Sequence, residues 1–488
     1  MLFNSWQFAI FFPVVFFLYY FIPHRYRYLL LLFASYYFYM SWDPELVTLI
    51  AATTVVTYAC GRVAGKKAWD IKWRRLALIL GVVLPLGELF FFKYFHFFSD
   101  QMRILLKSWS IPMKETTLQI ILPVGISFYT FQALSYVIDV YQERIEPQSN
   151  LGYYALYISF FPQLVAGPIE RSGDLMPQFF EKHSFHYEDG VYGLRMIVWG
   201  LFKKIVVADS ICTYVDLVYG GLAGREGLAY LVATVLFAIQ IYCDFSGYSD
   251  IALGTARMLG FRLTKNFNSP YFAKSIGEFW HRWHVSLSNW FRDYVYIPLG
   301  GNRVSFPRQC MNLMITFLLS GLWHGANWTF LAWGALFGIY RIVSLLTKSL
   351  REKVTQALHF QKNSWYGVGL RTGFTFCLVC IGWVFFRANS LQDALYVLGH
   401  SLTGITTPLT YLTNGYIGTG VDRYAFLKIA FCLTILCVFD IKQLKGDPFE
   451  QLQQRKTWVR WIIQIAFICM TIILSEKGIA ARFIYFQF

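Results

Sequence analysis

Long apolar stretches recur from one end of the chain to the other, separated by short polar connections. Many of them approach the ~20 residues that an α-helix needs to cross the hydrocarbon core of a bilayer. They are rich in Val, Leu, Ile and Phe without alternation of apolar and polar residues, which favours helices over the strands of a transmembrane barrel. The stretches that we predict to enter the membrane are 5–22, 28–42, 46–61, 76–98, 118–138, 151–167, 192–219, 227–243, 311–344, 368–388, 424–440 and 458–475.

The lengths of these stretches set the expected fold. Several are short, whereas 311–344 is long enough for a span followed by a re-entrant piece. We therefore predict an all-α, multi-pass integral membrane protein with about ten to twelve spans. No repeat or linker divides the sequence, so residues 1–488 are expected to form a single polytopic domain.

The charges of the first connections predict an orientation. Lys and Arg follow the first and third stretches, whereas 41–45 contains neither and carries Asp43 and Glu45. Because positively charged loops stay on the cytoplasmic side, the N-terminus is expected outside.

Composition supports a membrane environment. Of the 488 residues, 56% are apolar and 15% are charged, against about 25% charged in a soluble domain. The net charge is +15, and the Lys and Arg residues lie between the apolar runs. This placement favours anionic lipid over nucleic acid as the partner of the basic residues. A basic cytosolic mouth could also attract an anionic donor such as a phosphate-bearing thioester. The nine Cys include a C-x-x-C at Cys377 and Cys380 without a second pair, so we predict no metal or redox site there.

The segment 262–308 is the least membrane-like part of the middle of the chain. It clusters Trp, His, Arg and Asp between strongly apolar flanks. Polar backbone at membrane depth is tolerated only where it is buried in protein or lines a cavity. The segment is therefore expected to be either a cytoplasmic amphipathic stretch or a re-entrant funnel wall.

The run FLLSGLWHGANWTFLAWG, residues 317–334, places His324 in the middle of an apolar stretch. An intramembrane His is a candidate for function, since it is costly unless it faces a cavity or a partner. Imidazole can take a proton from a hydroxyl near neutral pH, as acyl transfer to an alcohol requires. Asn327 could orient the ring or donate to an oxyanion. The alternative is a core histidine bonded to a neighbouring helix.

The run GEFWHRWHVSLSNWFRDYVYIPLGGNR, residues 277–303, holds two more histidines. His281 and His284 are three apart and would share a face of a helix. No Asp or Glu follows at a ligand-like spacing, so a metal pair is disfavoured. We predict that His284 lines a substrate route, with an interfacial helix anchored by Trp as the alternative. Arg282 could bind phosphate or anionic lipid.

Two further polar groups interrupt apolar stretches. Asp244 and Asp250 flank Ser246 and Gly247 in IQIYCDFSGYSDIALG, residues 239–254. Paired carboxylates could act in acid/base catalysis, but we favour a helix end at which Ser and Asp cap the next helix. Lys203 and Lys204 are expected at the cytoplasmic interface.

Seven motifs follow one another in an order that resembles the membrane-bound O-acyltransferase family, in particular its bacterial alginate O-acetylation branch. They are MLFNSWQFAIFF, LPVGISFYTFQ, FFPQLVAGPIER, YCDFSGYSDIALG, FWHRWHVSLSNWFRDYVYIPLGGNR, GLWHGANWTF and GWVFFRA. The resemblance covers nearly the whole chain. It implies a multi-helix fold with a central tunnel through a thinned centre.

The resemblance also implies roles for individual residues. The family's catalytic His corresponds to His324 and the second His of its motif to His284, while His281 is assigned no role. With Asn327, these two form the expected catalytic set, and no metal is expected. The residues expected to line the substrate and donor tunnel are Trp283, Trp323, Arg282, Asp293 and Asp244.

The function expected from the resemblance is transfer of an acyl group, acetyl in the first instance, from a cytosolic thioester such as acetyl-CoA to an exported or cell-wall polysaccharide. No bound cofactor is expected. A separate extracytoplasmic esterase-like partner and a bacterial inner-membrane location are also implied. The alternatives are D-alanyl transfer into teichoic acid from a carrier-protein thioester, and a non-enzymatic transporter or flippase, which broken helices also fit.

Overall fold

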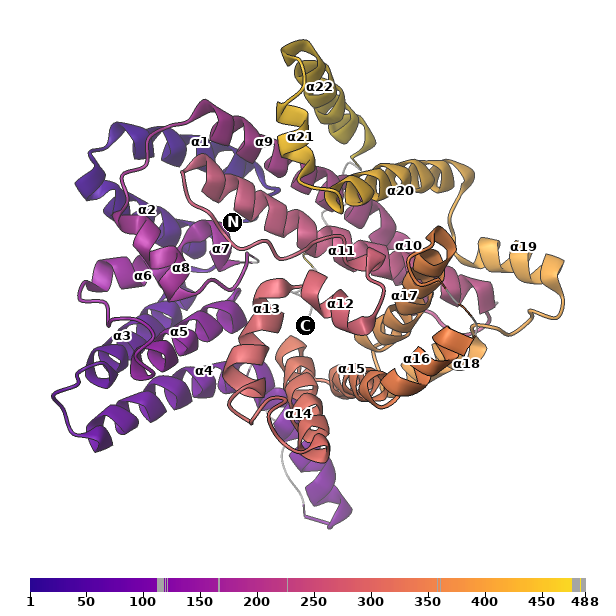
Figure 1. The fold of residues 1–488 in the computed structure, drawn as a ribbon, viewed down its shortest axis with the longest axis horizontal. Coiled ribbons are helices and arrows are strands. Elements are labelled where there is room, and N and C mark those ends of the chain that lie inside the picture. The colour runs from indigo at the N-terminus through magenta and orange to yellow at the C-terminus, as the bar shows by residue number, and fades with distance from the viewer. Residues whose placement is uncertain are drawn as a thin grey trace. The chain divides into compact units, whose positions relative to one another are not determined.

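The computed structural model describes residues 1–111, 118, 120, 122–165, 167–225, 227–357, 359, 361–475 and 483. Helices of several kinds account for all the regular secondary structure in these residues (Figure 1). Residues 119 and 121 of the predicted span 118–138, and residue 166 of 151–167, lie outside the described part. The all-α fold class is confirmed.

Contacts divide the chain into two compact units, 1–199 with 248–264, and 200–247 with 265–488. In the first unit, α3, α4 and α5 pack against one another, and α2 packs on α6. Its helices are α1 Trp6–Phe21, α2 His24–Met40, η1 Pro44–Leu46, α3 Val47–Ala64, α4 Ile71–Ser108, α5 Ile126–Tyr141, α6 Leu151–Ser159, α7 Phe161–Leu164, α8 Ser172–Leu175 and η2 Met176–Phe180. α9 Tyr187–Leu201 lies mostly in this unit.

The second unit contains all of the predicted catalytic residues. Its first elements are the π-helical turn η3 Phe202–Ala208, α10 Asp209–Tyr219 and most of α11 Gly227–Met258. The remainder are η4 Pro270–Phe272, α12 Ile276–Arg282, α13 Val285–Phe291, η5 Arg292–Tyr296, α14 Phe306–His324, α15 Trp328–Leu346, α16 Lys348–Ala357, α17 Trp365–Arg387, α18 Leu391–His400, α19 Pro408–Gly418, α20 Arg423–Gln443, α21 Pro448–Gln453 and α22 Thr457–Leu474.

Within the described residues, 7 helices are long and apolar enough to cross a membrane. They are Pro44–Ala64, Ile71–Ser108, Gly227–Met258, Trp328–Leu346, Trp365–Arg387, Arg423–Gln443 and Thr457–Leu474. The apolar helix Trp6–Phe21 is shorter. Large apolar side chains such as Ile472 and Ile473 of α22 are exposed, as expected where lipid is the solvent. The chain is therefore a multi-pass membrane protein, and the number of ten to twelve spans stays a prediction.

The predicted stretch 311–344 forms a helical hairpin of α14 and α15. Asn327 begins α15, since its Oδ1 accepts a hydrogen bond from the backbone N–H of Thr329 at 3.0 Å. The two helices approach closely at Gly321 and Gly334, where a Cβ would overlap a carbonyl oxygen of the opposite helix. The glycines thus make room for a neighbouring helix.

The polar segment 262–308 folds as short helices with non-helical connections. α12 begins at a cap from Ser275, whose hydroxyl accepts from the N–H of Glu278 at 3.2 Å. α12 ends at Arg282, and α13 begins after His284. His281 and His284 therefore do not lie on one helix face, and the expectation of a shared face is wrong. His281 is exposed at the end of α12, whereas His284 is buried.

Candidate active site

His324 is the last residue of α14 and is buried with 3% of its surface exposed. Its ring meets Trp333 of α15 edge-on, with centroids 4.9 Å apart, and Phe386 of α17 at 5.2 Å. The ring of Trp323, the preceding residue, lies with its centroid 5.0 Å from that of the imidazole. The imidazole is thus held by aromatic groups from three helices, which fix its orientation.

His284 stands at the N-terminus of α13 and is fully buried. Phe245 of α11 packs edge-on against its ring at a centroid distance of 4.7 Å. Burial lowers the pKa of His284, which lies between the candidate spans, to about 3. The ring is therefore neutral at physiological pH, and its unprotonated nitrogen can accept a hydrogen bond.

The indole of Trp323 contacts both histidines, with its centroid 5.9 Å from the His284 ring and 5.0 Å from the His324 ring. Around them, Trp283 packs against Trp383 at 4.9 Å and stacks on Phe279 at 5.6 Å. The structure therefore places four of the residues named from the sequence, His284, His324, Trp283 and Trp323, in one cluster of aromatic rings, and their roles stay predictions. Rings packed in this way keep water away from both imidazoles, which are 0% and 3% exposed.

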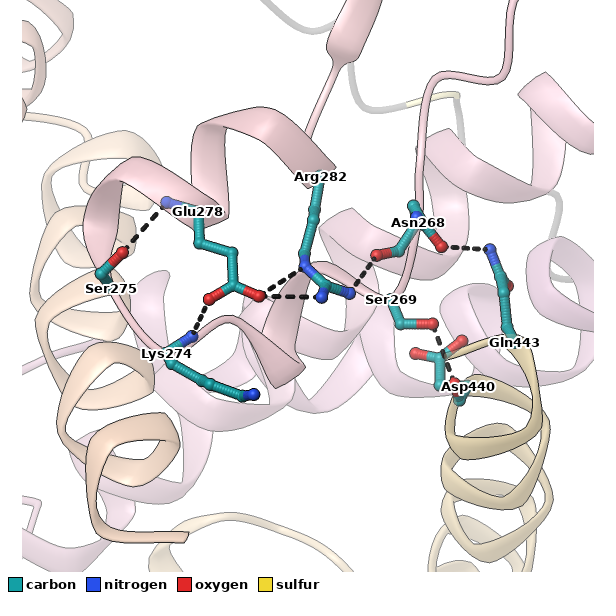
Figure 2. A network of polar contacts seen from close by, with 8 residues as sticks. All are labelled: Asn268, Ser269, Lys274, Ser275, Glu278, Arg282, Asp440 and Gln443. Atoms are coloured by element: carbon teal, nitrogen blue, oxygen red, sulfur yellow. Dashed lines mark hydrogen bonds and ion pairs between the residues drawn. The ribbon is translucent and has the colours of Figure 1, made fainter. Parts of the chain in front are cut away.

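Arg282 faces a polar network on the other side of the turn (Figure 2). Its guanidinium donates to Glu278 Oε1 at 2.8 Å and to the carbonyl oxygen of Asn268 at 3.2 Å. Glu278 Oε2 accepts in turn from the N–H of Lys274 at 2.9 Å. In this structure the guanidinium braces the turn before His284, and its predicted place in a donor tunnel stays a prediction.

The expected cap at Asp244 is wrong. α11 continues through Asp244 and Ser246 to Met258 without ending. Asp244 is buried and its Oδ1 lies 2.7 Å from Lys204 Nζ, which also lies 2.8 Å from Asp209 Oδ1. Lys203 and Lys204 are buried too, and their predicted place at the cytoplasmic interface stays a prediction. The opposite charges are satisfied by one another, so the helix has no reason to end at them.

The side chains of Asn327 and Asp293 contact groups other than the two histidines. The Asn327 side chain caps α15 with its oxygen and donates from Nδ2 to the carbonyl oxygen of Asn389 at 3.3 Å. Asp293 lies in the π-helical turn η5 and pairs with Arg292 at 2.7 Å. The catalytic role of Asn327 and the tunnel role of Asp293 remain predictions.

Sequence reasoning missed the groups that other helices bring to the histidines. Trp333, Phe386 and Phe245 were assigned no role, although GWVFFRA and YCDFSGYSDIALG were noted as motifs. Asn266, which bonds to the turn after His284, was missed as well. Their positions depend on helix packing, and only the clustering of motifs pointed towards them.

Comparison with known proteins settles the family. The model of the membrane-bound O-acyltransferase family matches residues 144–388. The chain is 42% identical over 458 residues to the probable alginate O-acetylase AlgI of Azotobacter vinelandii, covering 93% of this chain and 88% of that protein. The chain belongs to the membrane-bound O-acyltransferase family. It is thus an O-acyltransferase, and the resemblance read from its motifs is confirmed.

Two other relatives of this O-acyltransferase bear different names. The peptidoglycan O-acetyltransferase of Helicobacter pylori is 36% identical over 533 residues, covering 100% of this chain and 98% of that protein. The teichoic acid D-alanyltransferase of Bacillus subtilis is 27% identical over 279 residues, covering 54% of this chain and 69% of that protein. Similarity is thus higher and more extensive to the two O-acetylating relatives.

Proposed function

We propose that this O-acyltransferase passes an acetyl group from a cytosolic thioester, such as acetyl-CoA, across the membrane for the O-acetylation of an exported or cell-wall polysaccharide. The observation that supports this most is the pair of buried histidines in contact with Trp323, in a chain whose similar relatives are named as O-acetylases of alginate and peptidoglycan.

His324 is the general base in this proposal. Its imidazole takes the proton of the acceptor hydroxyl while the hydroxyl oxygen forms a bond to the thioester carbonyl carbon. The carbon–sulfur bond then breaks, and the imidazolium returns its proton to the leaving thiolate. Asn327 is proposed to donate to the oxyanion once substrate is bound.

His284 is proposed to line the donor route beside His324. Because burial keeps its ring neutral, it can accept a hydrogen bond from the incoming substrate. Trp283, Trp323, Arg282, Asp293 and Asp244 are the remaining residues that we assign to the substrate and donor tunnel.

The chain is proposed to act in the inner membrane of a bacterium, with a separate extracytoplasmic esterase-like enzyme that passes the acetyl group to the polymer. The net charge of +15 supports a phosphate-bearing donor, since positive surfaces raise the local concentration of anions.

The test uses His324→Ala and His284→Ala in a cell that lacks its own copy of the gene. We expect the O-acetyl content of the extracted polymer to fall to background in His324→Ala and at least about tenfold in His284→Ala. His281→Ala is the matched control, because this exposed imidazole lies in the same motif. Protein levels are compared by immunoblot. Undiminished acetylation in His324→Ala would remove the assignment of the base.

D-alanyl transfer is the alternative supported by a relative's name. Labelling cells with radioactive acetate and, separately, with D-alanine distinguishes the two reactions. His324-dependent incorporation of D-alanine but not of acetate would replace our proposal.

A further inference from the structure

The turn that carries His284 has a backbone conformation that needs support. His284 has φ 44° and ψ 55°, in the left-handed region. A residue with a Cβ rarely adopts this region, because the Cβ approaches a carbonyl oxygen. Other groups must therefore hold the turn in place.

A short segment after α11 provides this support. We call residues 266–269 the 266–269 strap; it lies beside the turn that joins α12 to α13. The N–H of Asn268 donates to the carbonyl oxygen of Arg282 at 2.9 Å, and the N–H of Val285 donates to the carbonyl oxygen of Asn266 at 3.0 Å. The strap thus bonds to the turn on both sides of Trp283 and His284.

The side chain of Asn266 performs the task that an N-cap residue usually performs for its own helix. His284 is the N-cap of α13, but its side chain makes no cap hydrogen bond. Instead, Asn266 Oδ1 accepts from the N–H of Ser286 at 3.1 Å. Asn266 is 0% exposed, so water does not compete for this bond. With the helix capped from another segment, the imidazole does not have to cap it.

We propose that Asn266 is a positioning residue, whose amide oxygen caps α13 and thereby fixes the left-handed turn that presents His284 to the substrate. This inference rests on the proposed function of His284. It adds a residue from a different segment of the chain to the machinery, one that touches neither the acyl group nor the hydroxyl.

The strap is itself tied to surrounding elements (Figure 2). The hydroxyl of Ser269 donates to the carbonyl oxygen of Asp440 in α20 at 3.0 Å, and Gln443 Nε2 donates to Asn268 Oδ1 at 3.3 Å. The Arg282 guanidinium bonds to the carbonyl oxygen of Asn268. With its backbone held at these points, Asn266 presents its oxygen at a fixed place.

The experiment measures thioester turnover by the full-length protein in lipid nanodiscs, with acetyl-CoA as the donor, a soluble polysaccharide as the source of the acceptor hydroxyl and released CoA thiol as the signal. In Asn266→Ala we expect kcat to fall about 10- to 100-fold, because a displacement near 1 Å can cost that much. KM for acetyl-CoA should stay within about threefold, since the residue does not bind the donor.

Two variants separate positioning from general stability. Asn266→Asp keeps an acceptor oxygen for the N–H of Ser286, and an anion is favourable at a helix N-terminus; its kcat should stay within about fivefold of the parent. His281→Ala is the matched control, since this exposed imidazole lies near the same turn, in α12, and has no part in holding the strap. It should keep parental kcat.

The outcomes are distinct. If His284→Ala abolishes turnover while Asn266→Ala keeps parental kcat, the positioning role is overturned and the proposed function stands. If His284→Ala keeps parental turnover, the proposed function of His284 is overturned, and the positioning role of Asn266 that rests on it is overturned as well. Equal loss in Asn266→Ala and Asn266→Asp would also overturn the capping role. If Asn266→Ala does not accumulate, Asn266→Ser, too short to reach Ser286, is measured with the same expectation.

Discussion

Gly321→Ala tests whether the close approach of α14 and α15 positions His324. A methyl group at residue 321 would meet the carbonyl oxygen and carbon of Phe330, the latter 3.1 Å from the new Cβ. The opposing atoms belong to the backbone, which cannot rotate away as a side chain can. The two helices must therefore separate, and His324, one turn after Gly321, must move with α14.

The size of the effect follows from this overlap. The methyl group and the Phe330 oxygen would lie well inside the 3.0 Å that real Cβ contacts keep, so relief requires a shift of roughly 1 Å. Misplacing a catalytic group by that distance can cost about 100-fold in rate. Overpacking adds roughly 1–3 kcal/mol of destabilisation. We therefore expect kcat for release of CoA to fall about 100-fold, with a smaller change in KM.

The assay is turnover in nanodiscs together with thermal unfolding of the same samples. Gly373→Ala in α17 is the matched control, because a Cβ there has no atom within 4 Å, and alanine has the higher helix propensity. It should retain parental turnover and stability. Parental turnover in Gly321→Ala would refute the claim that this contact sets the place of His324.

Two further predictions concern buried charges. Burial raises the pKa of Glu170 from an ordinary 4.5 to about 7, although the hydrogen bonds from Thr264 act in the opposite direction. The folded state therefore binds this proton more tightly than the unfolded state does. As a result, the protein loses stability as the pH rises from 4.5 through 7. Glu170→Gln should therefore have a higher Tm than the parent at pH 8 and no advantage near pH 4.5; an equal difference at both pH values would contradict this. Lys204→Met removes the cation that Asp209 and Asp244 share and should cost about 3–5 kcal/mol. Changing both carboxylates to Asn as well should restore much of the Tm, and a stable single variant would contradict the reasoning.

Local sequence patterns were sufficient to predict much of the fold. The spans around 44–64, 328–346 and 365–387 follow from runs of apolar residues, because transfer of a helix into lipid depends on its own side chains. The length of 311–344 predicted more than a single span there, and the structure places the break at Gly325 and the capping side chain of Asn327. His324 was found for the same reason, since one polar residue in an apolar run is costly wherever the run packs.

The remaining features depend on groups that are distant along the chain. The sequence HRWH has helical spacing, yet the helix ends within it, because Asn266 and Asn268 bond to the turn. Asp244 has the context of a cap, yet α11 passes through it, because Lys204 neutralises it from another helix. The sequence by itself thus determined the membrane fold, the family and the two candidate histidines. Tertiary structure alone decided the aromatic groups around them and the turn that holds His284, because hydrogen bonds and ring contacts between distant segments outweigh local propensity.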